Sequence, residues 1–242
     1  MIRNKKFNTS PMIVHAPGDI DFNFHWHKIK DALPKKSSVE CNCVPRLEII
    51  TWNSSENSTV KKNGCFEASL QIFGHSCNSL ESQTWSSNRE KIRLSVDFLN
   101  HSTADFILGV DSSDAIVVAP LNSIVSQFLE IDCDLLFNAE IRFSPPRGLN
   151  EIKSYENSLP TAPYFLNAGA WIGKKNFCLH FFQKALDISE SYFEFLHSEQ
   201  VCIKKAYKNM YPKVKIDDKC LIFQNLNLQE PTDIIICEAE WF

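Results

Sequence analysis

Two aspartates, Asp111 and Asp114, follow directly after an apolar run in the stretch "FILGVDSSDAIVV". Carboxylate oxygens are hard ligands of the kind that Mg²⁺ and Mn²⁺ prefer, and two of them on one tight turn can share a cation. Ser112 and Ser113 between them are small and suit such a turn. A cation held there would in turn bind phosphate groups, so the pair predicts a site for a phosphorylated ligand. The alternative is structural, with each aspartate capping the turn after a strand.

The elements that must position this pair alternate between strands and helices. Apolar runs predict strands at 46–52, 104–110, 134–140 and 165–173, with short ones at 214–217 and 220–225. Helical spacing or helix-end signals predict helices at 65–74, 88–102, 119–131, 175–189 and 198–211. We expect residues 142–164 to form a long proline-punctuated loop. The pattern predicts an α/β class with a largely parallel central sheet, and ligands of such sheets bind beyond the carboxyl ends of the strands.

Composition narrows the class of function. Of the 242 residues, 44% are hydrophobic and 22% charged, and the net charge of -4 argues against nucleic acid as a partner. No segment approaches the ~18 consecutive apolar residues that a membrane span requires. The N-terminal stretch lacks the apolar core of a secretory signal, so we expect a cytoplasmic location and no membrane span.

The order of several short motifs resembles one enzyme family. The pieces are "EKIRL", "VDSSDAIVV", "LLFNAE", "FLNAGAWIG", "SEQ" and "KIDDKCLIFQNLN", within roughly residues 46–228. In this order they resemble the glycosyltransferase domain of procollagen-lysine hydroxylases and related GT-A-type sugar transferases. The resemblance implies a GT-A-like single domain over 46–242, preceded by an irregular segment over 1–45. It also implies transfer of a sugar from a UDP-sugar to a hydroxyl group of a glycan, protein or small-molecule acceptor.

The same resemblance implies roles for individual residues. Asp111 and Asp114 would hold Mn²⁺, or Mg²⁺, against the diphosphate of the UDP-sugar. The nucleotide side of the site would include Thr51, Lys91, Val110 and Ser112. The catalytic and sugar-binding side would include Glu140, Asn167, Glu199 and Gln200. Either Glu140 or Glu199 would serve as the base that takes the proton of the acceptor hydroxyl.

The chain also departs from the family pattern. The family has a third metal ligand, a histidine, after the segment that corresponds to "IFQNL", and no histidine follows it here. The N-terminal stretch "MIVHAPGD" looks like that missing segment placed near the N-terminus instead. Residues 1–45 are therefore a candidate permuted family strand, and His15 is a candidate third metal ligand. Of the family's acidic run before its glutamine, one carboxylate remains here, Glu199, directly before Gln200, so the sequence does not identify the acceptor.

Two other functions stay open alongside the transferase. One is a catalytically inactive relative that binds a nucleotide-sugar or glycan, which the missing histidine and the depleted acidic run favour. The other is a Mg²⁺-dependent phosphohydrolase that uses the same aspartate pair. It is disfavoured because no further His or Asp cluster in the sequence supplies a general acid and a second metal.

Overall fold

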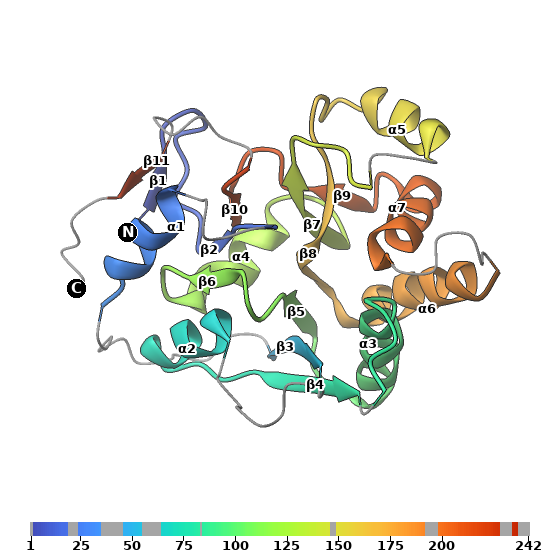
Figure 1. Cartoon of the computed structure of the whole chain (residues 1–242), viewed down its shortest axis with the longest axis horizontal. Coiled ribbons are helices and arrows are strands. Elements are labelled where there is room, and N and C mark those ends of the chain that lie inside the picture. Colours follow the sequence, from blue (N-terminus) through green and yellow to red (C-terminus); the bar gives the residue numbers. More distant parts are fainter. Residues whose placement is uncertain are drawn as a thin grey trace.

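The computed structural model of the chain describes residues 2–18, 24–34, 46–54, 64–82, 84–145, 149–191, 198–227 and 234–236 (Figure 1). Within these residues, none of the helices combines the length and the apolar character that crossing a membrane requires.

A six-stranded sheet with the order β4-β3-β5-β8-β7-β9 forms the centre of the protein. Its strands are β3 (Leu47–Ser54), β4 (Asn78–Ser82), β5 (Phe106–Val110), β7 (Leu135–Glu140), β8 (Phe165–Lys174) and β9 (Val214–Ile216). β3 runs parallel to β4 and β5, and β7 runs parallel to β9, whereas β8 is antiparallel to both β5 and β7. The predicted α/β class with a largely parallel sheet is confirmed. β4 is not predicted from the sequence, because its polar stretch "NSLES" contains no apolar run.

Hydrophobic layers cover both faces of this sheet, because successive residues of a strand point to opposite faces. On β8, Trp171 packs in one layer and Ile172 in the other, and Ile107 and Leu108 of β5 divide in the same way. The first layer includes side chains from α3 (Glu90–His101), α6 (Lys175–Ser191) and α7 (Glu199–Met210). The second layer includes side chains from α2 (Cys65–Ile72) and α4 (Ile124–Leu129), and a short 3₁₀ turn, η3 (Leu121–Ser123), precedes α4. The five predicted helices are therefore present.

A smaller sheet with the order β10-β2-β6 begins where the chain leaves β5 (Figure 1). Its strands are β2 (Ile13–His15), β6 (Ala115–Val117) and β10 (Phe223–Asn225). β2 lies in the middle, parallel to β10 and antiparallel to β6. A further antiparallel pair joins β1 (Ile2–Asn4) to β11 (Ile234–Ile236), so segments near the two ends of the chain lie side by side.

The prediction that residues 1–45 are irregular is wrong for the part that the structure describes. That part contains β1, β2 and the helix α1 (Phe24–Asp31), and Trp26 and Ile29 of α1 are buried in a cluster with Val14 of β2. The strands have only three residues each, too few for a periodic pattern. They form because strands distant in the sequence supply their hydrogen-bond partners.

The predicted long loop over 142–164 also differs from the structure. It contains the helix α5 (Asn150–Asn157), which buries Ile152 and Glu156. Ile152 packs with Leu149 and with Val201 of α7, so tertiary contacts stabilise a helix whose sequence is mostly polar.

Candidate functional site

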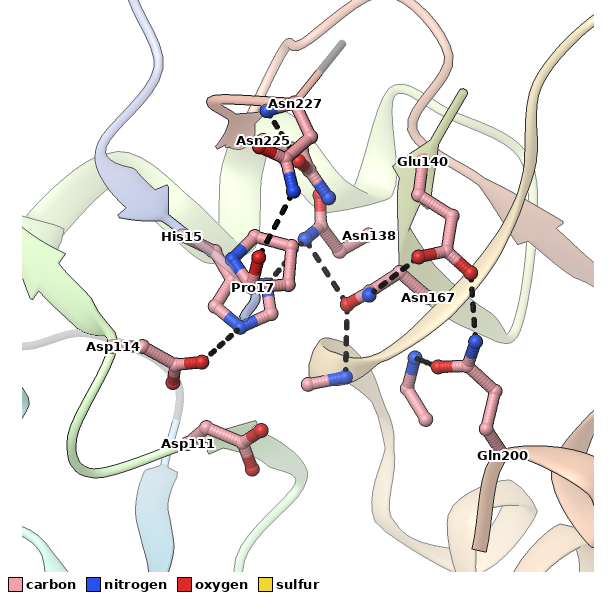
Figure 2. Close-up of polar contacts among 12 residues, drawn as sticks. His15, Pro17, Asp111, Asp114, Asn138, Glu140, Asn167, Gln200, Asn225 and Asn227 are labelled. Atoms are coloured by element: carbon pink, nitrogen blue, oxygen red, sulfur yellow. Dashed lines mark hydrogen bonds and ion pairs between the residues drawn. The ribbon is translucent and has the colours of Figure 1, made fainter. Parts of the chain in front are cut away.

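Three predicted metal ligands meet where β5 ends and the small sheet begins. Asp111 follows β5, Asp114 precedes β6, and His15 is the last residue of β2, paired in register with Ala115. One ligand atom from each of the three lies within 4.8 Å of the others. The Nε2 atom of His15 is 3.5 Å from Oδ2 of Asp114 (Figure 2). Tertiary structure thus brings a residue of the N-terminal segment to the aspartate pair.

Charge and burial set the state of this cluster. His15 is 1% exposed, and its Nε2 has no hydrogen-bond partner among the described residues; the same holds for the buried Oδ1 of Asp114. Burial alone would lower the pKa of His15, but the carboxylate of Asp114 outweighs it and raises that pKa. Burial would raise the pKa of Asp114, and His15 outweighs it in the opposite direction. The two groups therefore favour each other's charged forms.

The cluster has the chemistry and the space of a divalent cation site. Its donor set of one imidazole nitrogen and two carboxylates suits Mn²⁺, and its buried polar atoms without hydrogen bonds are available as ligands. Gly169 of β8 leaves room beside it. A Cβ at this position would lie 2.3 Å from Cε1 of His15 and 2.9 Å from Oδ2 of Asp111. The residues present therefore fit the metal that the resemblance implies.

Gly169→Ala is expected to weaken Mn²⁺ binding roughly 10- to 100-fold, because the added methyl group must displace His15 or Asp111 at a cost of about 1–3 kcal/mol. Titration of Mn²⁺ followed by calorimetry measures this change. Gly74→Ala is the matched control: Gly74 has φ of +75° and no atom within 4 Å of its Cβ position. That variant should lose about 1 kcal/mol of stability and keep its Mn²⁺ affinity. Equal affinities in all three proteins would contradict the placement of the cation beside Gly169.

A cleft of about 470 Å³ opens beside the aspartates, a size within the range of roughly 300–1,000 Å³ that is typical of small-molecule sites. Its lining consists of Trp52, Asn53, Trp85, Asn88, Lys91, Asp111, Ser112, Ser113 and Asp114. Nζ of Lys91 lies 2.7 Å from Oδ1 of Asp111 and 3.3 Å from Oε1 of Glu199. Burial would lower the pKa of Lys91, but these two carboxylates outweigh it and raise the pKa. Lys91 therefore carries a positive charge in the lining of the cleft.

The other residues predicted on the nucleotide side divide between the cleft and the core. Ser112 lines the cleft and donates a hydrogen bond to the carboxylate of Glu67 at 2.7 Å. The Val110 side chain, in contrast, is fully buried in the hydrophobic layer and is not part of the cleft lining. Thr51 is also fully buried outside that lining, and its hydroxyl has no hydrogen-bond partner among the described residues. On β3 it is Trp52 and Asn53 that face the cleft instead.

The predicted catalytic residues other than Glu199 form one hydrogen-bonded group (Figure 2). Nδ2 of Asn167 donates to Oε2 of Glu140 at 3.1 Å, and Nε2 of Gln200 donates to Oε1 of Glu140 at 2.7 Å. Gln200 also accepts the backbone N–H of Ala168 at 3.1 Å. Burial raises the pKa of Glu140 to about 7, against the opposing charge of Lys204. The group holds a carboxylate in a fixed orientation with a pKa suited to proton transfer near neutral pH.

A buried lysine, Lys204, lies next to Glu140. Lys204 of α7 has no exposed surface, and its Nζ lies 3.1 Å from Oε2 of Glu156 and 3.8 Å from Oε1 of Glu140. The ammonium also lies 4.5 Å from the centre of the Phe143 ring. Burial lowers the pKa of Lys204 and raises that of Glu156, so each group depends on the other to stay charged.

Several site residues were not predicted from the sequence, although two of them had a local signal. Lys204 is four positions after Gln200 on one helix, which places both side chains on the same face. Asn138 is two positions before Glu140 on β7, the spacing of one face of a strand. Trp52 had no such signal, because its apolar strand gave no indication of a cleft beside it.

A family model agrees with the resemblance seen in the motifs. The family model described as the PLOD GT domain matches residues 46–238, which is more than half of the chain. No curated protein matches the chain. Among solved structures, the apo-form glycosyltransferase GlyE of Streptococcus pneumoniae TIGR4 is similar, with 12% sequence identity and a TM-score of 0.42. The similarity covers 74% of this chain and 46% of that one, so this chain spans less than half of the GlyE structure's length.

Proposed function

The chain belongs to the PLOD GT domain family, that of the glycosyltransferase domain of procollagen lysine hydroxylases, and we propose that it is a metal-dependent transferase acting on a UDP-sugar. In this proposal, the sugar moves from the nucleotide to a hydroxyl group of an acceptor. The diphosphate lies at the aspartate pair, and the nucleoside lies in the cleft that Trp52 and Lys91 line.

The observation that carries this proposal is the cluster of His15, Asp111 and Asp114. Their ligand atoms lie within 4.8 Å of one another at the edge of the cleft. These three residues would hold Mn²⁺, which when bound supplies Lewis-acid stabilisation of the negative charge on the departing UDP. Lys91 adds a second positive charge next to Asp111. An acidic chain can thus bind an anionic donor without an extended basic surface.

On the acceptor side we assign Glu140 as the base. Asn167 and Gln200 hold its two oxygens, and Lys204 provides a counter-charge from behind. Glu199 is the less suitable of the two predicted bases: burial raises its pKa as well, but its Oε1 lies 3.3 Å from Nζ of Lys91 and so pairs with a cleft-lining ammonium on the nucleotide side of the site. Glu140 would take the proton of the acceptor hydroxyl as the oxygen attacks the sugar.

A catalytically inactive relative is the second candidate, and one contact favours it. Nζ of Lys91 is 2.7 Å from Oδ1 of Asp111, so this ammonium already forms an ion pair with one of the oxygens that a metal would use. In such a protein the cleft would bind nucleotide or glycan without turnover.

One experiment separates these candidates. The protein is incubated with Mn²⁺ and either UDP-glucose or UDP-galactose, and UDP release is followed with and without glycan acceptors. Release that depends on both metal and sugar donor supports the transferase. Metal-dependent binding of UDP without release supports the inactive relative, and hydrolysis of simple phosphate esters instead would support a phosphohydrolase.

The pH dependence of transfer should follow Glu140. Only its carboxylate form accepts a proton, and burial raises its pKa to about 7, so the rate is expected to rise with pH up to about 7 and then level off. Glu140→Gln should lower the rate roughly 10²-fold and remove this pH-dependent rise. The measurement is the pH profile of acceptor-dependent UDP release. The exposed Glu151→Gln serves as control and should keep the wild-type profile. A Glu140→Gln variant with the wild-type profile would exclude Glu140 as the base.

A further inference from the structure

Asn138, which none of the proposed roles includes, lies between the metal cluster and the acceptor side. It is fully buried on β7 and pairs in register with Asn167 of β8. Its Nδ2 lies 2.9 Å from Nδ1 of His15 and 3.4 Å from Oδ1 of Asn167 (Figure 2). Its Oδ1 accepts the backbone N–H of Ala139 at 2.9 Å. Each polar atom of the amide is therefore held by a neighbour.

This arrangement determines which nitrogen of the neutral His15 ring carries the proton. Because the Ala139 N–H holds Oδ1, the NH₂ group of Asn138 faces the ring and, when the ring is neutral, donates to Nδ1. An Nδ1 atom that accepts a hydrogen bond carries no proton, so the proton of the neutral ring lies on Nε2. That nitrogen points to Oδ2 of Asp114, 3.5 Å away.

A metal ligand needs the opposite tautomer. A histidine that binds a cation through Nε2 carries its proton on Nδ1 and donates it to an acceptor, which fixes the ring and raises its basicity. For Asn138 to accept that proton, its amide must turn so that Oδ1 faces the ring. The turn breaks the hydrogen bond from Ala139 and also brings Oδ1 of Asn138 towards Oδ1 of Asn167.

We propose that Asn138 is a positioning residue that sets the tautomer of His15 and thereby lowers the affinity of the site for a divalent cation. This inference rests on the proposed function, because it takes His15 as a metal ligand. It also links the two halves of the site. The amide that must turn when the cation binds is hydrogen-bonded to Asn167, which orients Glu140.

The test compares the wild type with Asn138→Asp, whose carboxylate can accept the hydrogen bond from Ala139 and one from Nδ1 of the ring. The first readout uses the metal-free protein labelled with ¹⁵N-histidine, in alkaline buffer where the ring is neutral. The His15 signals are assigned by their loss in His15→Gln. We expect the proton on Nε2 in the wild type and on Nδ1 in Asn138→Asp. The second readout is Mn²⁺ affinity from calorimetry, which should rise about tenfold in the variant.

Asn4→Asp is the matched control, because Asn4 is also a fully buried asparagine and donates a hydrogen bond to Gln224 instead of to His15. It should leave the His15 tautomer and the Mn²⁺ affinity as in the wild type. If the new charge unfolds Asn138→Asp, Asn138→Ser replaces it; its hydroxyl donates or accepts, so both tautomers should be populated.

The results separate this inference from the proposed function. A wild-type ring with its proton on Nδ1, or an unchanged tautomer and affinity in the variants, overturns the role of Asn138. A wild-type protein that binds no Mn²⁺ overturns the metal-dependent function, and the metal-free tautomer comparison still decides whether Asn138 controls His15.

Discussion

Asp111→Ala and Asp114→Ala are each expected to lower metal- and sugar-dependent UDP release by at least about 10³-fold. Each substitution removes one of two carboxylates in a three-residue cluster, and the remaining pair holds a cation weakly. Loss of the cation removes several kcal/mol of charge stabilisation from the departing diphosphate, and each 1.4 kcal/mol corresponds to a factor of about ten in rate. The measurement is UDP release at saturating UDP-sugar, together with Mn²⁺ affinity of each variant.

The matched control for these variants is Asp105→Ala. Asp105 immediately precedes β5, the strand that Asp111 follows. Its carboxylate is half exposed and lies 3.6 Å from the exposed guanidinium of Arg46. Exposed pairs of this kind contribute only about 0–1 kcal/mol, so activity should stay at the wild-type level. Unchanged UDP release in both Asp111→Ala and Asp114→Ala would show that the aspartate pair does not act in catalysis.

Lys204→Met is expected to lower the free energy of unfolding by about 3–5 kcal/mol near neutral pH, because it leaves two buried carboxylates without their counter-charge. Lys204 is fully buried between Glu156 and Glu140, and no other ion pair to either carboxylate is present among the described residues. Methionine fills a similar volume, so the loss should come from charge and not from a cavity.

The pH dependence of this loss distinguishes charge from packing. Burial raises the pKa of Glu140 and Glu156 above that of the unfolded chain, and removal of the ammonium raises it further. A carboxyl group whose pKa is higher in the folded state than in the unfolded chain destabilises the folded state once the pH rises above the pKa of that group in the unfolded chain. The loss of unfolding free energy in Lys204→Met should therefore be small at about pH 5 and reach its full size at about pH 8. Urea denaturation at both pH values measures it.

Lys208→Met, on the same helix, is the control. Lys208 is partly exposed and pairs with the exposed Glu151, so its loss should cost less than about 1 kcal/mol at either pH. A Lys204→Met deficit of the same size at both pH values would mean that packing, and not charge, accounts for the role of this lysine.

Much of the fold could be predicted from local patterns. The apolar runs around Leu108, Leu136 and Ile172 indicate buried strands, because only the interior of a sheet accommodates such segments. Helical spacing indicated α3, because Ile92, Val96 and Leu99 recur on one face of the helix and are buried together. The patterns failed at β2, β6 and α5, whose stability comes from partners far away in the sequence.

The sequence by itself determined that two carboxylates stand on one turn after a buried strand, because both the strand signal and the Asp111–Asp114 spacing are local. Only the tertiary structure decided which distant groups surround them. The 3.5 Å approach of His15, the contact of Lys91 with Asp111 and the position of Lys204 behind Glu140 depend on strand and helix packing. Electrostatic and hydrogen-bond energies depend on distance and burial, and neither is contained in the order of residues along one segment.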